Sequence, residues 1–206
     1  MPLDLWLAFA AASTALLLIP GPTVLLVLSY ALSQGRRTAL ACATGVAAGD
    51  LIAMSASLAG LGALVAASAT AFTLLKWAGA IYLAYLGLKL LRAPAASLDR
   101  PEAEPARPAT IFRHAATVTA LNPKSIAFFI AFVPQFVMPA QPLLPQFAIL
   151  TATFVTLAAL NALAYALAAD RLRATIRRPA VLTWLTRAGG GALLAMAAAT
   201  ATLRRA

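Results

Sequence analysis

Long apolar runs, separated by short polar or basic stretches, make up most of the chain. Because about 20 apolar residues suffice for a helix to cross the hydrocarbon core of a bilayer, each run is long enough to span a membrane. A stretch rich in Pro, Ala and charge at 93–110 is expected to be a cytoplasmic linker. The pattern predicts six spans, at about residues 3–33, 38–66, 68–91, 111–137, 146–169 and 180–203.

The first span is interrupted near its middle by Pro20, Gly21 and Pro22. Each proline removes a backbone donor and clashes with the preceding turn, so the helix is expected to break there. In lipid, a break is tolerated only where protein or a water-filled cavity covers the freed backbone groups. A new helix starting near Pro22 would direct the positive end of its dipole toward the bilayer centre, as in transporters that bind anionic groups. The alternative is a plain proline kink between packed helices.

A second interruption, Asn122-Pro123-Lys124, lies within the fourth span. Asn is a strong N-cap and Pro a favourable first residue, so a helix is expected to begin at Pro123. Each half of the chain has three spans, and the first span of each half is broken. The sequence therefore predicts an all-α integral membrane protein, a single domain of residues 1–206 with two inverted three-helix repeats at 1–92 and 111–206. Coincidence in an alanine-rich sequence is the alternative.

The composition fits a membrane protein, with 62% hydrophobic and 11% charged residues. The net charge of +10 does not form a basic stripe with interleaved aromatics, so no nucleic-acid partner is expected. By the positive-inside bias, the connections that carry the basic residues are cytoplasmic, which leaves both termini outside. These connections follow the first, third and fifth spans, and they hold Arg36, Arg37, Lys89, Arg92, Arg100, Arg107, Arg113, Arg171, Arg173, Arg177 and Arg178.

Two ionisable residues lie well inside spans, Asp50 in the second and Lys124 in the fourth. A charge at the bilayer centre costs at least about 2.5 kcal/mol on insertion scales, so both are functional candidates. One hypothesis is that Asp50 accepts a substrate ammonium or a coupling proton, while Lys124 and the two helix N-termini hold a substrate carboxylate. The alternative is that the two residues only neutralise each other between packed helices.

Other polar and small residues indicate packing rather than chemistry. Gly45 and Gly49 have the small-xxx-small spacing that lets two helices approach closely, and Asn161 is expected to bond a neighbouring helix. With one cysteine, Cys42, and one histidine, His114, the sequence offers no metal-ligand spacing and no catalytic constellation. We expect no enzyme activity, no metal and no cofactor, with the proton gradient as the energy source.

Several short motifs follow one another along almost the whole chain. They are Pro20-Gly21-Pro22, Gly35-Arg36-Arg37, Gly45 with Gly49-Asp50, Leu75 to Leu83 (LKWAGAIYL), Asn122-Pro123-Lys124-Ser125-Ile126 and Pro134-Gln135-Phe136. This ordered set resembles the LysE/RhtB superfamily of bacterial amino-acid exporters, and within it the homoserine/threonine efflux type.

The resemblance implies an exporter in the bacterial cytoplasmic (inner) membrane, driven by the proton gradient and moving neutral or basic amino acids outward. It is also compatible with a homo-oligomer. It implies that six motif positions lie near the translocation pathway: Pro20, Gly21, Pro22, Asn122, Pro123 and Lys124. The second half is rich in alanine after Gly189, which leaves the substrate open because pocket shape should select it.

The resulting interpretation is a secondary transporter that exports a threonine- or homoserine-like amino acid, or another neutral or basic one. It would work by proton antiport and alternating access, with the amino acid, protons and the lipid bilayer as partners and Asp50 as the coupling candidate. Two other classes stay open. A cation or metal exporter of related fold would need several intramembrane acids or a Cys/His set, and a non-transporting scaffold would pack its proline breaks dry.

Overall fold

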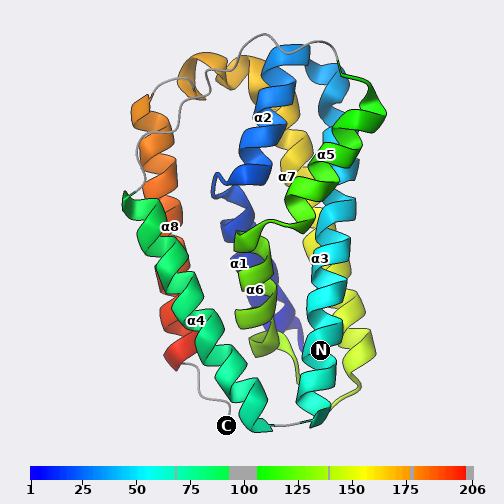
Figure 1. Ribbon diagram of the computed structural model, residues 1–206, viewed down its shortest axis with the longest axis vertical. Helices are drawn as coiled ribbons and strands as arrows, with labels where there is room; N and C mark the ends of the chain where they lie inside the picture. The colour runs from blue at the N-terminus through cyan, green and yellow to red at the C-terminus, as the bar shows by residue number, and fades with distance from the viewer. Residues whose placement is uncertain (68, 93–105, 139, 177–178, 203–206) are drawn as a thin grey trace.

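The computed structural model describes residues 1–67, 69–92, 106–138, 140–176 and 179–202, and all regular elements among them are helices (Figure 1). The first half contains α1 (Leu3–Leu18), α2 (Pro22–Gln34), the 3-10 helix η1 (Arg36–Thr38), α3 (Ala39–Ala67) and α4 (Ala69–Arg92). The second half contains α5 (Pro108–Ala120), α6 (Pro123–Ala131), the 3-10 helix η2 (Val133–Phe136), α7 (Leu143–Ile176) and α8 (Pro179–Thr202). The predicted all-α class is confirmed.

Both predicted helix breaks are present at the predicted residues. The axes of α1 and α2 differ by 56°, and those of α5 and α6 by 46°. Each second helix begins with a proline, Pro22 in α2 and Pro123 in α6. This is the position at which the missing N–H of proline costs nothing and its fixed φ suits the helix.

The two halves run in opposite directions. In Figure 1 the α1–α2 pair and α4 ascend while α3 descends, whereas the α5–α6 pair and α8 descend while α7 ascends, and the N-terminus and the described end of α8 both lie in the lower part. The helix α3 packs against α5 and α7, and α4 packs against α8. By length and hydropathy, two helices in the described ranges qualify as membrane spans, or up to four if each bent pair counts as one. Six spans in an inverted repeat therefore stay a prediction.

Some predicted boundaries are wrong by a few residues. The helix α5 begins at Pro108 rather than 111, and α7 extends from Leu143 to Ile176 rather than from 146 to 169. Part of the predicted basic connection, with Arg171 and Arg173, is therefore helical. Leu, Ala and Arg are strong helix formers, and no Gly or Pro interrupts the chain between 170 and 176. Most of the predicted linker, residues 93–105, lies outside the described ranges.

Small residues hold the bundle together at two contacts. A Cβ atom at Gly45 would lie 2.5 Å from the carbonyl oxygen of Phe112, and one at Gly49 would lie 2.5 Å from that of Ala116. Only glycine allows α3 to approach α5 this closely, which confirms the predicted role of the pair. This close contact fixes the first helix of the second broken pair next to Asp50, the residue that follows Gly49.

Candidate substrate site

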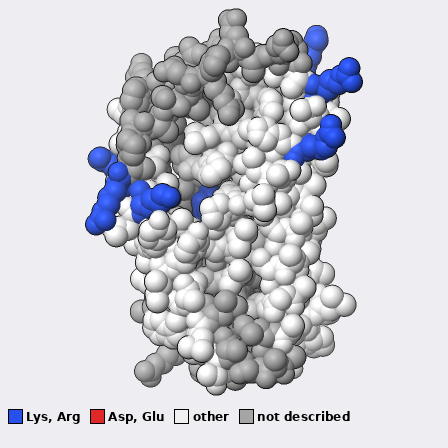
Figure 2. Space-filling view, viewed as in Figure 1, with Lys and Arg blue, Asp and Glu red and all other residues white. Residues whose placement is uncertain are grey.

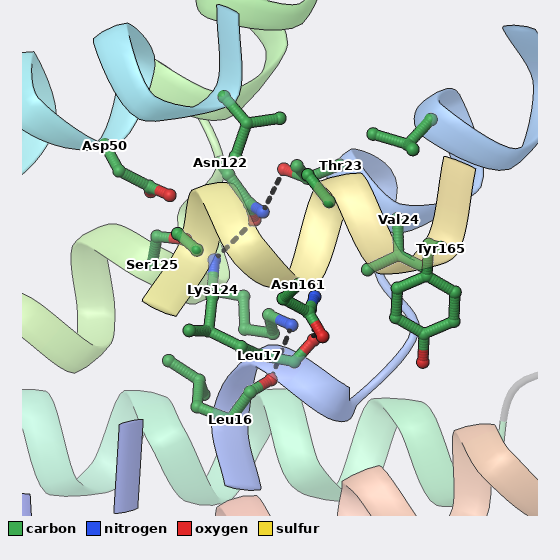
Figure 3. A pocket seen from close by; sticks show the side chains of 14 residues that line it. Leu16, Leu17, Thr23, Val24, Asp50, Asn122, Lys124, Ser125, Asn161 and Tyr165 are labelled. Carbon is green, nitrogen blue, oxygen red and sulfur yellow. Dashed lines mark hydrogen bonds between the residues drawn. The ribbon is translucent and has the colours of Figure 1, made fainter. Parts of the chain in front are cut away.

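The two helix breaks lie side by side near mid-height and border a small cavity (Figures 1 and 3). Its wall is made by α1, α2, α3, α6 and α7 together with Asn122. The cavity volume is about 20 Å³, which is enough for about one water molecule. An amino acid does not fit into this space, so the structure represents a closed form of the site.

The Lys124 side chain crosses from α6 to the C-terminal end of α1. Its Nζ donates hydrogen bonds to the carbonyl oxygens of Leu16 at 3.0 Å and Ile19 at 2.9 Å. Both carbonyls lie at the C-terminal end of α1, which carries the negative end of the dipole, and the Leu16 oxygen also accepts the backbone N–H of Ile19 at 3.2 Å. A Cβ atom at Gly21 would lie 3.4 Å from the same Nζ, so a glycine there leaves room for the ammonium.

Two side chains of α7 donate hydrogen bonds to the two carbonyls that lie between those of Leu16 and Ile19. Asn161 Nδ2 donates to the Leu17 oxygen at 3.1 Å, and the Tyr165 hydroxyl donates to the Leu18 oxygen at 3.2 Å. The predicted bond from Asn161 to a neighbouring helix is confirmed. With Lys124, these two residues supply a side-chain donor to each of four consecutive carbonyls at the first break.

The second break is closed by Asn122, which is 2% exposed. Its Oδ1 accepts a hydrogen bond from the backbone N–H of Lys124 at 3.0 Å, which confirms the predicted cap of α6. Its Nδ2 donates to Thr23 Oγ1 at 3.1 Å, and Thr23 Oγ1 is 3.3 Å from Thr119 Oγ1. This chain of polar contacts links the second break to the first turn of α2.

The N-terminus of α2, in contrast, has no capping side chain. Its N-cap, Gly21, makes no side-chain bond, and Thr23 and Val24 of the first turn line the cavity. The positive end of the α2 dipole therefore borders the same space as the Lys124 ammonium, which favours an anionic group there.

Asp50 lies on the opposite side of the cavity, on α3. It is 2% exposed, and its Oδ1 makes no hydrogen bond within the described part of the chain. Figure 3 shows the Lys124 side chain extending toward the end of α1 rather than toward Asp50. The two charges attract each other across the cavity, but no hydrogen bond joins them, because the two hydrogen bonds of the ammonium go to neutral carbonyls. A buried carboxylate oxygen without a partner is costly, which marks the position as a functional candidate.

The predicted prolines do not line the cavity, but they determine where the helices around it end and begin. Pro20 is buried within the first break, while Pro22 and Pro123 start their helices and are exposed. The sequence analysis missed Tyr165, although a signal for it exists. Together with Asn161 it belongs to an i, i+3, i+4, i+7 set on α7 whose other members, Ala158 and Ala162, also line the cavity.

A cluster of phenylalanines fills the interior below the breaks. The rings of Phe129 and Phe154 meet edge to face with centroids 4.8 Å apart, and those of Phe128 and Phe132 are 5.2 Å apart. All six members are at most 7% exposed: Phe9, Phe128, Phe129, Phe132, Phe136 and Phe154. Since α6 and η2 descend from the second break (Figure 1), this cluster separates the cavity from the end of the molecule that carries the termini.

A second, larger hollow of about 550 Å³ lies between α3 and α7. Its lining residues, among them Leu58 and Phe147, carry only apolar and hydroxyl side chains, and none is ionisable. It therefore offers no charged partner to a zwitterion. In the described ranges no three His, Cys, Asp or Glu residues are grouped so that they could hold a metal ion.

Long apolar helices, two of them broken where they border a buried cavity with opposite charges, are typical of membrane carriers. Comparison with protein families identifies the kind of carrier. The model of the LysE type translocator matches residues 14–203, and the chain belongs to this family. Members of this family are transporters rather than enzymes, and the resemblance drawn from the motifs is confirmed.

The curated relatives include named efflux proteins. The homoserine/homoserine lactone efflux protein of Salmonella typhimurium is 35% identical over 206 residues, covering 100% of both chains. The leucine efflux protein of Salmonella choleraesuis is 33% identical over 141 residues, 68% of this chain and 66% of the relative. An uncharacterized membrane protein of Vibrio cholerae is 36% identical over 205 residues, 97% of this chain and 100% of the relative. No solved structure matches the chain.

Proposed function

We propose that this protein exports a small neutral amino acid from the cytoplasm through the cavity between the two helix breaks, by proton antiport and alternating access. The observation that supports this most is the pair of opposite charges that line one cavity, Asp50 with an oxygen that has no hydrogen-bond partner in the described ranges and the Lys124 ammonium beside the α2 N-terminus. This arrangement is complementary to a zwitterion. The relatives named for homoserine and leucine efflux support a neutral substrate.

In this proposal the carboxylate of the substrate binds Lys124 and the first turn of α2, and Asp50 supplies the negative charge for its α-ammonium. Pro20, Gly21, Pro22, Asn122 and Pro123 create the two helix ends that make these groups available. The remaining wall is formed mainly by aliphatic side chains such as Val27 and Val46. No further acid lines the cavity, so a basic side chain would find no partner there.

Asp50 is the proposed coupling residue. A carboxylate that binds either a proton or the substrate ammonium, but not both, exchanges one for the other. If Asp50 is accessible from each side of the membrane in turn, an inward proton gradient then drives the amino acid outward. The closed cavity and the phenylalanine cluster below it represent the form in which the lower pathway is shut.

The distribution of charge supports an orientation. On the face shown in Figure 2, the described Lys and Arg side chains lie in the upper part down to about mid-height, and none lies in the lower part. The upper end includes η1 with Arg36 and Arg37, and α4 ends with Lys89 and Arg92 at about mid-height (Figure 1). By the positive-inside bias we propose six spans in the inner membrane with this end in the cytoplasm and both termini outside.

Efflux from preloaded cells that express the protein tests the proposal. The panel contains homoserine, threonine, leucine, lysine and cadmium ion, each with and without a protonophore. We expect loss of at least one neutral amino acid that the protonophore abolishes, and no loss of cadmium. Export of cadmium alone would instead support the cation exporter. Normal insertion without export of any panel member would overturn the proposal in favour of the scaffold.

A further inference from the structure

We infer that the carbonyl oxygens of Leu16 and Ile19 form a primary-ammonium site, which the Lys124 side chain occupies in the empty carrier and vacates when the substrate ammonium arrives. The inference rests on the proposed function for the identity of the substrate. The ammonium site itself can be tested without any amino acid.

The geometry of the first break is that of an ammonium site. Two backbone oxygens converge on one nitrogen at 3.0 and 2.9 Å, at the negative end of α1. A primary ammonium has three N–H donors and no acceptor, so two carbonyls and one further acceptor satisfy it. Asp50 lines the same cavity with an oxygen that has no partner in the described ranges, and it supplies the negative charge that the carbonyls lack.

The occupant of the site is suited to leave it. Lys124 has a flexible four-carbon stem, and Gly21 opposite its Nζ presents no side chain. In the closed form the partly buried Lys124 ammonium hydrogen-bonds only neutral carbonyls, while one oxygen of the buried Asp50 carboxylate has no hydrogen-bond partner in the described ranges. A zwitterion offers partners to these groups at once, because its ammonium takes the carbonyls in the cavity that Asp50 also lines and its carboxylate takes Lys124.

The size of the cavity makes displacement necessary. With about 20 Å³ of free volume, a substrate cannot bind beside Lys124 while the side chain stays where it is. Movement of Lys124 from the carbonyls to the substrate carboxylate provides both the space and the partner. The same movement breaks the hydrogen bonds that hold α6 to the end of α1. Substrate binding therefore allows the two breaks to move relative to each other.

Chemical rescue tests this site directly. Lys124→Ala removes three methylene groups and the ammonium, and propylammonium replaces the same atoms. We expect propylammonium chloride to raise the melting temperature of purified Lys124→Ala by several degrees and to saturate, with little effect on the wild type. Tetramethylammonium chloride, which has no N–H donor, should give no rise. The matched control is Lys89→Ala, which removes an exposed lysine at the end of α4 and should not respond to propylammonium.

Equal responses of Lys124→Ala to propylammonium and tetramethylammonium, or no response to either, would overturn the inference. If Lys124→Ala does not fold, competition on the wild type decides instead. N-acetyl-leucine lacks the ammonium and should inhibit leucine efflux about tenfold or more less effectively than leucine methyl ester, which retains it. Equal inhibition would overturn the ammonium site. Failure of the amine rescue with intact efflux would refute this inference alone, whereas rescue without efflux of any amino acid would refute the proposed function alone.

Discussion

Both helix breaks are followed by a helix that begins with proline, but they satisfy their backbone groups in different ways. At the second break, the N–H groups of Leu121 and Asn122 bond the carbonyls of Thr117 and Thr119, and the Asn122 side chain caps α6. At the first break, side chains of α6 and α7 bond the end of α1, and no side chain caps α2. The second break is thus closed mainly by its own backbone and by its own capping side chain, whereas the carbonyls of the first break are bonded by side chains of other helices.

The difference also extends to the surroundings. The second break is attached to α3 through Gly45 and Gly49, whose contacts with α5 leave no room for a methyl group. The first break bonds instead to the side chains of Lys124, Asn161 and Tyr165, which belong to α6 and α7. We therefore expect ligand-dependent changes at the first break and mainly structural effects at the second, and the following predictions test this contrast from the largest effect to the smallest.

Asp50→Asn should abolish gradient-driven efflux. A charge-assisted hydrogen bond contributes about 1.5–3 kcal/mol, so loss of substrate binding alone lowers transport by about tenfold or more, and loss of the coupling proton lowers it further. The melting temperature should stay the same or rise, because a buried charge is removed. Asp4→Asn, at an exposed position in the first turn of α1, is the control for both measurements. Unchanged gradient-driven efflux in Asp50→Asn would remove Asp50 from the mechanism.

Gly49→Ala should destabilise the fold by about 1–3 kcal/mol, because the added methyl group overlaps the backbone of α5. Gly60→Ala on the same helix has open space around the new Cβ and should leave stability unchanged or raise it by up to about 1 kcal/mol. Unfolding in mixed detergent micelles measures both. Equal effects of the two substitutions would show that α3 and α5 are not in close contact.

Asn122→Ala should destabilise the protein by about 0.5–2 kcal/mol through loss of the α6 cap. Asn122→Ser retains a capping oxygen and should recover most of that loss. If Asn122 acts only on the hinge, the concentration dependence of efflux should change little in either variant. A large change in apparent affinity, with normal stability, would instead place Asn122 in contact with the substrate.

Tyr165→Phe should have the smallest effect, a destabilisation of about 0.6 kcal/mol, which is the average for a single hydrogen bond between membrane helices. It removes one of the four side-chain bonds to the end of α1. Tyr85→Phe, at a position on α4 that is 54% exposed, is the matched control and should show no change. If the first break is held by exchangeable bonds, Tyr165→Phe should also alter the efflux rate, while Tyr85→Phe should not.

Local chemistry made the breaks predictable. Proline and glycine determine where α1 and α5 end, and Asn122 determines how α6 begins, because these effects depend only on near neighbours in the chain. The charges of Asp50 and Lys124 were also recognisable, since an ionisable residue within an apolar run is conspicuous.

The partners of those groups could not be predicted in the same way. That Lys124 bonds Leu16 and Ile19, more than 100 residues away, follows from the tertiary arrangement that brings the start of α6 to the end of α1. The role of Tyr165 likewise depends on which face of α7 meets the first break. The extension of α7 to Ile176 was missed because basic residues indicate a connection even where helix propensity continues.

Protection of an introduced cysteine tests most directly whether substrate binds in the cavity between the two breaks. Cys42 is the only cysteine in the chain, so Cys42→Ser gives a background for Ser125→Cys in the cavity wall and for Thr151→Cys in the hollow between α3 and α7. The measurement is the rate of modification by a small methanethiosulfonate reagent, with and without homoserine or leucine. We predict that one of these amino acids slows modification at position 125 severalfold and leaves position 151 unchanged. Modification at 125 that neither amino acid affects, in a variant that still exports it, would contradict the account.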